Sequence, residues 1–234
     1  MASPCKESRP HLLLADDHAI VLEVLKGFLE KSYVVIGTVT DGRSLVTEAI
    51  RLKPDMIIVD IGMPLLNGLD AARRIRDQLP SVRIVFLTMQ QNAHLAAAAL
   101  TLGHAGFVLK HSAAAELVTA IEQVWRGNPY ISPKLRSGAR VEHKPEANQF
   151  SKNLTPRQRD IVQLFAEGYG LKEIAARLNL SLKTVEFHKH HIMAEFNVKS
   201  NADLVLLAVK RGLISINPNI RSADGKVSQK LSSH

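Results

Sequence analysis

Cysteine and long hydrophobic runs are scarce in this chain of 234 residues. The single cysteine, Cys5, cannot form an internal disulfide or a cysteine-rich metal site, which agrees with a reducing compartment. No apolar run approaches the roughly 18 residues of a membrane helix, and the first residues lack the apolar core of a secretion signal. A Gly-x-x-x-x-Gly-Lys-Ser/Thr loop is also missing, which argues against a nucleotide hydrolase. We therefore expect a cytoplasmic protein with no membrane partner.

Positive charge is unevenly distributed along the chain. The sequence contains 30 Lys and Arg against 22 Asp and Glu, a formal net charge of +8. Residues 1–128 contain 13 basic and 13 acidic side chains, whereas residues 151–234 contain 13 basic and 7 acidic ones. The excess in the second half favours an anionic partner such as nucleic acid, and a solvated basic surface is the alternative.

Short apolar runs alternate with segments of helical period between residues 11 and 126. This order predicts an α/β domain over residues 9–127, with a doubly wound, five-stranded parallel sheet and helices on both faces. The predicted strands are His11–Ala15, Tyr33–Thr38, Asp55–Asp60, Val82–Thr88 and Ala105–Leu109. The predicted helices are Ala19–Glu30, Gly42–Leu52, Gly68–Gln78, Ala93–Leu102 and Ala113–Arg126.

The second half of the chain has a different pattern. Proline, glycine and serine punctuate residues 128–150, which predicts a linker between two domains. Thr155-Pro156-Arg157-Gln158 then matches a capping box with proline at the first helical position. The first predicted helix starts at this box and ends near Glu167. Three more predicted helices follow, Lys172–Leu178, Leu182–Phe196 and Asn201–Arg211, with Asn179-Leu180-Ser181 as a tight turn between the second and the third. We expect an all-α, four-helix helix-turn-helix domain over residues 151–216 and a disordered tail over 217–234.

Five polar side chains stand at the carboxyl ends of predicted strands. Asp16 and Asp17 follow the first strand, Asp60 ends the third, Thr88 ends the fourth and Lys110 follows the fifth. Functional groups gather at this edge of a parallel sheet. Three close carboxylates favour a hard divalent cation, most simply Mg²⁺, and this metal with a hydroxyl and an ammonium can neutralise a phosphoryl group. Singly, each residue has an ordinary structural alternative, such as a helix-capping Asp or a solvated Lys.

Four segments resemble the receiver domains of bacterial response regulators, which have a flavodoxin-like fold. They are Leu14-Ala15-Asp16-Asp17-His18, Val59-Asp60-Ile61-Gly62-Met63-Pro64, Leu87-Thr88 and Gly106-Phe107-Val108-Leu109-Lys110. The resemblance implies that Asp60 accepts a phosphoryl group from a sensor histidine kinase. It also implies the remaining roles: Mg²⁺ bound by Asp17, Asp60 and the Gly62 carbonyl, with Asp16 acting largely through water, and phosphoryl oxygens held by Thr88 and Lys110.

Three further positions bear on how such a domain would switch. The resemblance implies that the ring of Phe107 rotates inward on phosphorylation, and a plain core aromatic is the alternative. His111 follows Lys110 where many receivers have proline, so this loop lacks the rigidity of that residue. Met89, beside Thr88, is bulkier than the residue common there, and we expect it to narrow access and leave modest autodephosphorylation.

Three segments of the second half resemble the LuxR-type DNA-binding domain. They are Leu154-Thr155-Pro156-Arg157-Gln158-Arg159, Lys172–Leu178 and Lys183–His188. With the receiver in front, the whole chain is similar to the NarL/FixJ class of response regulators. Helical spacing turns Val185, His188, Ile192 and Phe196 inward on the third helix, and turns Lys183, Glu186, Phe187 and His190 outward, toward the major groove.

The outward stripe supplies the expected contacts with double-stranded DNA. Glu186 would accept from a cytosine amino group, Phe187 would touch a thymine methyl, and His190 would donate to a purine acceptor. A solvated Glu186 is one alternative, and a metal site on the neighbouring histidines is another, although no Cys or acidic partner lies beside them. The expected phosphate contacts are Lys172, Ser181, Lys183, Thr184, Lys189 and Lys199.

These features predict a phosphorylation-controlled transcription regulator and not an enzyme. The unphosphorylated receiver would mask the recognition helix or the helix Asn201–Arg211, through which the resemblance implies that two DNA-bound copies pair as a homodimer. One alternative is an aspartyl phosphatase of the haloacid dehalogenase type, but such enzymes have a second Asp where this chain has Gly62. Another alternative is a receiver that serves only as a structural or ligand-binding dimer module.

Overall fold

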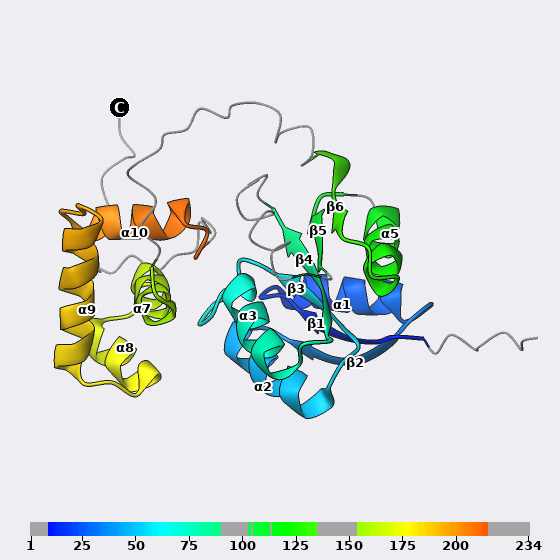
Figure 1. Cartoon of the computed structure of the whole chain (residues 1–234), viewed down its shortest axis with the longest axis horizontal. Helices are drawn as coiled ribbons and strands as arrows, with labels where there is room; N and C mark the ends of the chain where they lie inside the picture. Colours follow the sequence, from blue (N-terminus) through cyan, green and yellow to red (C-terminus); the bar gives the residue numbers. More distant parts are fainter. Residues whose placement is uncertain (1–8, 90–102, 104, 113, 135–153, 215–234) are drawn as a thin grey trace, which may run out of the picture. The chain divides into compact units, whose positions relative to one another are not determined.

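A computed structural model describes residues 9–89, 103, 105–112, 114–134 and 154–214 of the chain (Figure 1). The chain divides into two compact units, residues 1–151 and residues 152–234, and each unit is described by itself. None of the described helices is long and apolar enough to cross a membrane.

The first unit is built on a six-stranded, fully parallel sheet in the order β2-β1-β3-β4-β5-β6. Its strands are β1 (His11–Ala15), β2 (Val34–Val39), β3 (Met56–Asp60), β4 (Arg83–Thr88), β5 (Ala105–Leu109) and β6 (Tyr130–Ile131). The chain moves outward in one direction from β1 to β2 and in the other from β3 onward. In doubly wound sheets, ligand sites lie beyond the carboxyl ends of the strands at such a reversal.

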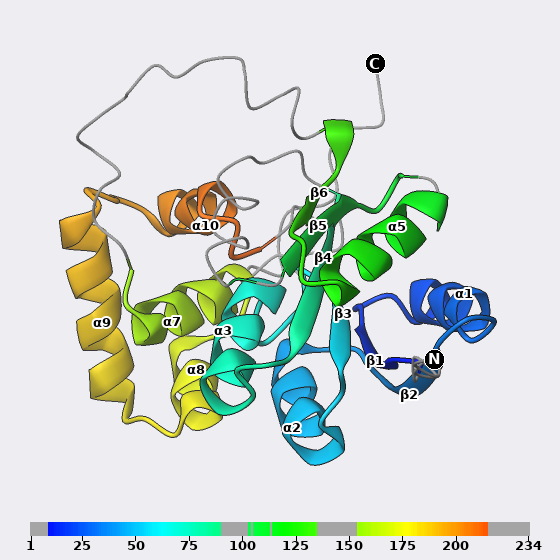
Figure 2. The same ribbon diagram turned by 45° about the vertical axis from the view of Figure 1, so that its right-hand side comes forward.

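Helices cover both faces of this sheet, as Figure 2 shows. The described helices of this unit are α1 (Ala19–Leu29), α2 (Gly42–Leu52), α3 (Gly68–Gln78) and α5 (Ala114–Trp125). Alternate strand residues enter separate cores: Ile57 and Phe86 face α2 and α3, whereas Ile58 and Val85 face α1 and α5. Burial on both faces explains why β3 and β5 are uninterrupted apolar runs.

The predicted strands and helices of this unit are confirmed, with ends that differ by about a residue, wherever the structure describes them. The predicted helix Ala93–Leu102 lies outside the described residues. The prediction of five strands is wrong, because Tyr130–Ile131 pairs with Gly106 and Phe107 as a sixth strand. It follows that the predicted linker, residues 128–150, starts too early. A strand of two residues between prolines has no measurable period, and its sequence is typical of a turn.

The second unit consists of four described helices, α7 (Pro156–Ala166), α8 (Leu171–Leu178), α9 (Leu182–Glu195) and α10 (Asn201–Lys210). They enclose a core that includes Val162, Ile192, Leu204 and Ala208. The capping box predicted at Thr155 is present, with Gln158 as its partner. The predicted tail over 217–234 lies outside the described residues.

The turn between α8 and α9 forms as its sequence predicts. Asn179 ends α8 in the left-handed region, with φ of 54°. Ser181 caps α9 by accepting a hydrogen bond from the Thr184 amide at 3.0 Å. These two residues set the direction in which α9 leaves the turn.

Candidate functional site

The carboxyl edge of the sheet gathers the polar residues that the sequence places at strand ends. Asp16 directly follows β1, and its neighbour Ala15 pairs with Val59 of β3. Asp60, the last residue of β3, lies opposite Leu87, and Thr88, the last residue of β4, lies opposite Leu109. Since Lys110 comes next after Leu109, four neighbouring strands deliver their polar side chains to one edge.

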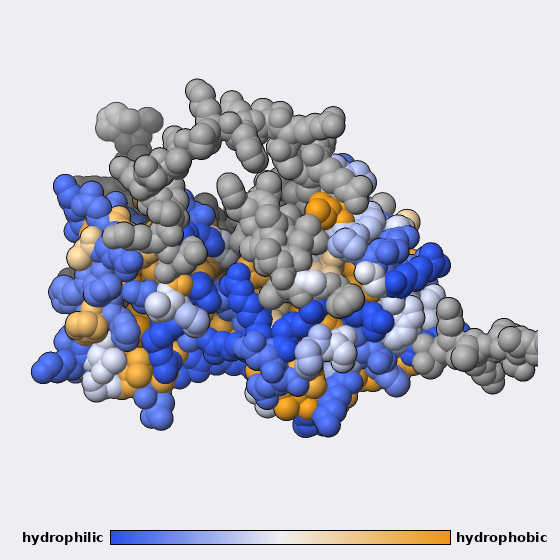
Figure 3. All heavy atoms as spheres, viewed as in Figure 1, coloured by the Kyte–Doolittle hydropathy of each residue, from blue (hydrophilic) through white to orange (hydrophobic). Residues whose placement is uncertain are grey.

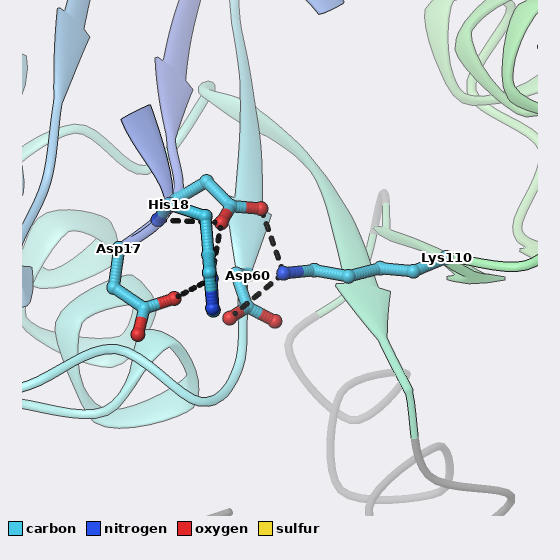
Figure 4. Close-up of polar contacts among 5 residues, drawn as sticks. Asp17, His18, Asp60 and Lys110 are labelled. Carbon is cyan, nitrogen blue, oxygen red and sulfur yellow. Dashed lines mark hydrogen bonds and ion pairs between the residues drawn. The ribbon is translucent and has the colours of Figure 1, made fainter. Parts of the chain in front are cut away.

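The Lys110 ammonium is the centre of this group (Figure 4). Its Nζ lies 2.7 Å from Asp16 Oδ2 and 3.1 Å from Asp60 Oδ2. The Asp16 side chain is fully buried, and only 12% of the Lys110 side chain is exposed. A single cation therefore joins two carboxylates that are almost out of contact with water.

Burial and charge shift the pKa values of this pair. Burial raises the pKa of Asp60 above its ordinary value, and the nearby Lys110 offsets this only in part. Burial also lowers the pKa of Lys110, but the carboxylates of Asp60 and Asp16 outweigh that effect, so the net pKa is raised. The site thus keeps its ammonium charged while it holds Asp60 as a carboxylate that is poorly stabilised, an arrangement common at reactive positions.

Asp17 and His18 complete the group on the solvent side. The His18 Nδ1 lies 2.7 Å from Asp17 Oδ1, and the His18 amide donates to Asp16 Oδ1 at 3.0 Å. Among the described residues, Asp16, Asp17 and His18 form the one group of three potential ligands whose atoms lie within 4.8 Å of one another. No role was expected for His18, although its position directly after two aspartates is a signal in the sequence.

The residues of this edge fit a hard divalent cation. The carboxylates of Asp16 and Asp60 share one ammonium, and Asp17 adds a third carboxylate beside Asp16, so negative charge is in excess. Carboxylate oxygens are ligands that Mg²⁺ prefers. The Gly62 amide donates a hydrogen bond to the Asp60 carboxylate, which ties the loop after β3 to the site.

Gly68 is a second position that the sequence analysis missed. It opens α3, and its amide donates to the Ile61 carbonyl at 3.0 Å. A Cβ at this position would lie 2.1 Å from the Asp60 carbonyl oxygen. Only glycine lets α3 start this close to the strand that ends in Asp60.

Phe107 and Met89 occupy contrasting positions. Phe107 is fully buried in β5, and its ring centroid lies 6.4 Å from that of Phe86. This burial fits the core alternative for Phe107, and its role as a switch stays a prediction. Met89, next to Thr88, is 65% exposed, and its effect on access to the edge of the sheet stays a prediction.

In the second unit, α9 has a buried face and an exposed face, and Glu186, expected on the exposed face, is half-buried. Val185 and Ile192 are fully buried, whereas Phe187 is 65% exposed and Lys183 and His190 are also exposed. Figure 3 shows mainly hydrophilic side chains over the visible face of this helix. His188 and Phe196, expected to pack inward, are only half-buried. The His188 ring lies edge-on to the ring of Phe187, with 5.8 Å between their centroids, and Phe196 is the C-cap of the helix.

Three of the expected DNA contacts are engaged within the domain. The Lys189 ammonium donates to Asn201 Oδ1 at 2.8 Å and lies 4.6 Å from the centre of the Phe165 ring. It therefore turns toward α10, and not outward as a phosphate contact would. The hydroxyls of Ser181 and Thr184 share a hydrogen bond of 2.7 Å, and the Thr184 amide also donates to the Ser181 hydroxyl.

His190 is held by a backbone contact. Its Nδ1 lies 2.9 Å from the Glu186 carbonyl oxygen. Because a carbonyl only accepts, Nδ1 must be the donor, and the neutral ring then presents Nε2 as an acceptor. Lys172, Lys183 and Lys199 are exposed.

Comparisons with known proteins agree with both units. Residues 12–122 match the model of the response regulator receiver domain, and residues 152–208 match that of the bacterial regulatory proteins of the luxR family. The chain is 35% identical over 213 residues to the oxygen regulatory protein NreC of Staphylococcus aureus strain JH9, with 87% of this chain and 98% of NreC covered. The chain belongs to the response regulators with a LuxR-type DNA-binding domain.

Solved structures of this class are similar along most of the chain. One is RcsB from Salmonella enterica serovar Typhimurium, bound to promoter rprA in the presence of the phosphomimetic BeF₃⁻. It is 30% identical to this chain with a TM-score of 0.58, and the alignment covers 85% of this chain and 98% of the RcsB chain. Another is a structure of two RcsB dimers bound to two parallel DNAs, which is 28% identical with a TM-score of 0.54. The alignment covers 86% of this chain and 98% of the RcsB chain. This response regulator is therefore a phosphorylation-controlled transcription regulator of a two-component system, with a histidine kinase and DNA as its partners.

The raised pKa of Asp60 predicts that this side chain destabilises the receiver. Replacing it, as Asp60→Asn, should increase the free energy of unfolding at pH 7 without Mg²⁺ by roughly 0.5–2 kcal/mol. A carboxyl whose pKa is raised by folding costs stability above that pKa, and the cost is relieved as pH falls. The difference in unfolding free energy between Asp60→Asn and the wild type should therefore become smaller as pH falls from 7 toward about 4.

Trp125, the only tryptophan of the chain, lies on α5 and reports on the receiver in urea unfolding followed by fluorescence. Asp77→Asn, at an exposed position of α3, is the control and should leave the unfolding free energy unchanged. An Asp60→Asn protein no more stable than the wild type at pH 7 would contradict the account of the site.

Proposed function

We propose that Asp60 is the phosphoryl acceptor of this response regulator. The observation that carries the proposal is the Lys110 ammonium, which lies within 3.1 Å of Asp60 at the edge where Thr88 also ends its strand. In the transfer, an Asp60 carboxylate oxygen forms a bond to phosphorus as the P–N bond of the kinase phosphohistidine breaks. The departing imidazole takes up a proton, and an aspartyl phosphate remains.

Lys110 and Thr88 then hold the product. The ammonium already neighbours Asp60 and stays charged, so it can donate to a phosphoryl oxygen with little movement. The Thr88 hydroxyl stands on the adjacent strand and can donate to another. Positioned donors of this kind account for most catalysis of phosphoryl transfer.

Mg²⁺ would be held by the carboxylates of Asp17 and Asp60 and the carbonyl of Gly62, with Asp16 acting through water. Bound there, it supplies positive charge that neutralises the transferred group. His18, at 2.7 Å from Asp17, orients that carboxylate. The receiver extends through Ser132, and the DNA-binding domain spans residues 151–216.

The outward stripe of α9 enters the major groove, with Phe187 and Glu186 against base edges and Lys183 on phosphate. Since Nδ1 of His190 donates to Glu186, the neutral ring accepts a hydrogen bond from the amino group of adenine or cytosine. This replaces the expectation that His190 donates to a purine. Lys172, Lys199 and the amide end of α9 near Ser181 and Thr184 contact further phosphates.

Two copies bind DNA as a homodimer through α10. Leu204, Leu207 and Ala208 are buried in their own domain, whereas Leu206 is 54% exposed on the other side of the helix. A two-fold pair of such domains fits a two-fold operator with half-sites about one helical turn apart. Phosphorylation of Asp60 favours this pairing by releasing a mask on the recognition helix or on α10.

Phosphoryl acceptance by Asp60 is tested with a small phosphodonor, phosphoramidate, and Mg²⁺. We expect intact-mass measurement to show one phosphoryl group on the wild type and none on Asp60→Asn, because the acceptor oxygen is lost. The control Asp77→Asn should be labelled like the wild type. Equal labelling of Asp60→Asn would exclude this acceptor, and sustained hydrolysis of a phosphate ester would instead favour the phosphatase alternative.

Two lysines of α9 form a matched pair for DNA binding. Lys183→Ala should reduce the salt dependence of DNA affinity, the slope of log K against log salt, by about 0.9 per protomer, because one phosphate contact is lost. Lys189→Ala should leave the slope unchanged and destabilise the domain by roughly 1 kcal/mol, since it loses contacts with Asn201 and Phe165. Fluorescence anisotropy across a salt series measures the slopes, and the reverse pattern would refute the assignment.

A further inference from the structure

The turn that carries Lys110 is fastened to β4 on one side and is closed by a hydrogen bond of its own. The Lys110 amide donates to the Thr88 carbonyl at 2.8 Å, and the Ser112 amide donates to the Leu109 carbonyl at 2.9 Å. Lys110 and His111 are thus the two central residues of a turn whose base is Leu109. A contact that holds the backbone of Leu109 in place therefore also holds the position from which the Lys110 side chain extends to Asp60.

Ser132 provides that anchor. It follows directly after β6, where the pairing with β5 ends, and it is fully buried. Its amide continues the ladder by donating to the Phe107 carbonyl at 2.9 Å. Its Oγ accepts a hydrogen bond from the Leu109 amide at 3.2 Å. Because β6 has ended at this point, the Ser132 side chain replaces the strand carbonyl that would otherwise accept from Leu109.

Glu116 orients this hydroxyl. The Ser132 Oγ donates to the Glu116 carboxylate in a short hydrogen bond. Glu116 lies in the first turn of α5 and is half-buried. With its proton committed to a carboxylate, the hydroxyl oxygen can only accept from Leu109, and such a charge-assisted bond is stronger than a neutral one.

We propose that Ser132, oriented by Glu116, is a positioning residue for phosphoryl acceptance. It acts through Leu109 and holds the Lys110 turn so that the ammonium stays within reach of Asp60. This function suits a loop in which His111 leaves the backbone without the restriction of a proline. The inference rests on the proposed role of Asp60 and Lys110, and it extends the machinery to a residue in the segment that leads out of the receiver.

The test is a double-mutant cycle on the rate of phosphoryl acceptance from phosphoramidate with Mg²⁺, measured in the full chain. Ser132→Ala should slow the rate about three- to tenfold, the factor that corresponds to one net hydrogen bond. In a Lys110→Ala background, Ser132→Ala should cause no further loss, because the residue acts only through Lys110. A merely structural role would slow both backgrounds by the same factor.

Glu116→Ala changes a half-buried side chain and serves as a second variant should Ser132→Ala fold poorly. It should slow the rate in the same direction by a smaller factor, again only when Lys110 is present. Glu122→Ala, at an exposed position of the same helix, is the matched control and should retain the wild-type rate. Hydrogen exchange of the Leu109 amide should quicken in Ser132→Ala, which tests the anchor without any phosphodonor.

The outcomes separate this inference from the function beneath it. A wild type that takes no phosphoryl group on Asp60 would overturn the proposed function and the positioning role with it. A wild type labelled on Asp60 whose Ser132→Ala variant keeps the full rate, or loses the same factor with and without Lys110, would overturn the positioning role alone.

Discussion

The ion pair of Lys110 with two buried carboxylates is the interaction that organises the functional edge of the receiver. Asp16 and Asp60 come from neighbouring strands, and each carries a charge that is nearly removed from water. A single ammonium cannot compensate both of these and Asp17 as well. The imbalance makes the edge of the sheet a place for a divalent cation and, beside it, for a group that carries several oxygens.

The surrounding fold holds these charges together. Parallel pairing brings the carboxyl ends of β1, β3, β4 and β5 to one edge, and the observed strand order makes these ends neighbours. Gly68 lets α3 begin against the Asp60 strand end, and Ser132 fastens the turn that carries Lys110. The excess of basic over acidic residues lies mostly in the other unit. Phosphate chemistry and DNA recognition are therefore separated along the chain and must communicate through its conformation.

Most of the fold and the central site could be predicted because their signals are periodic or positional. Buried parallel strands are continuous apolar runs, and charged residues at their ends, such as Asp60 and Lys110, stand out against them. Tyr130–Ile131 is too short to show a period, so β6 and its neighbour Ser132 were assigned to a linker. Gly68 was missed because the approach of the Asp60 carbonyl is a tertiary contact with no trace in the sequence.

On α9 the sequence indicated faces but not partners. Helical spacing correctly separated Val185 and Ile192 from Phe187, since it depends only on 3.6 residues per turn. It could not foresee that Lys189 bends back to Asn201, because that depends on where α10 begins in space. The spacing likewise gave no sign of the contact between His190 Nδ1 and the Glu186 carbonyl, in which Nδ1 is the donor.

The most direct test of the central claim, that phosphorylation of Asp60 controls DNA binding, is selection from a random DNA pool at fixed salt. Wild type and Asp60→Asn would each be treated with phosphodonor or left untreated, and affinities for the enriched sequence would follow. The account predicts a two-fold motif that the phosphorylated wild type binds more tightly, with no such gain for Asp60→Asn. Equal affinity with and without phosphate on Asp60 would contradict it.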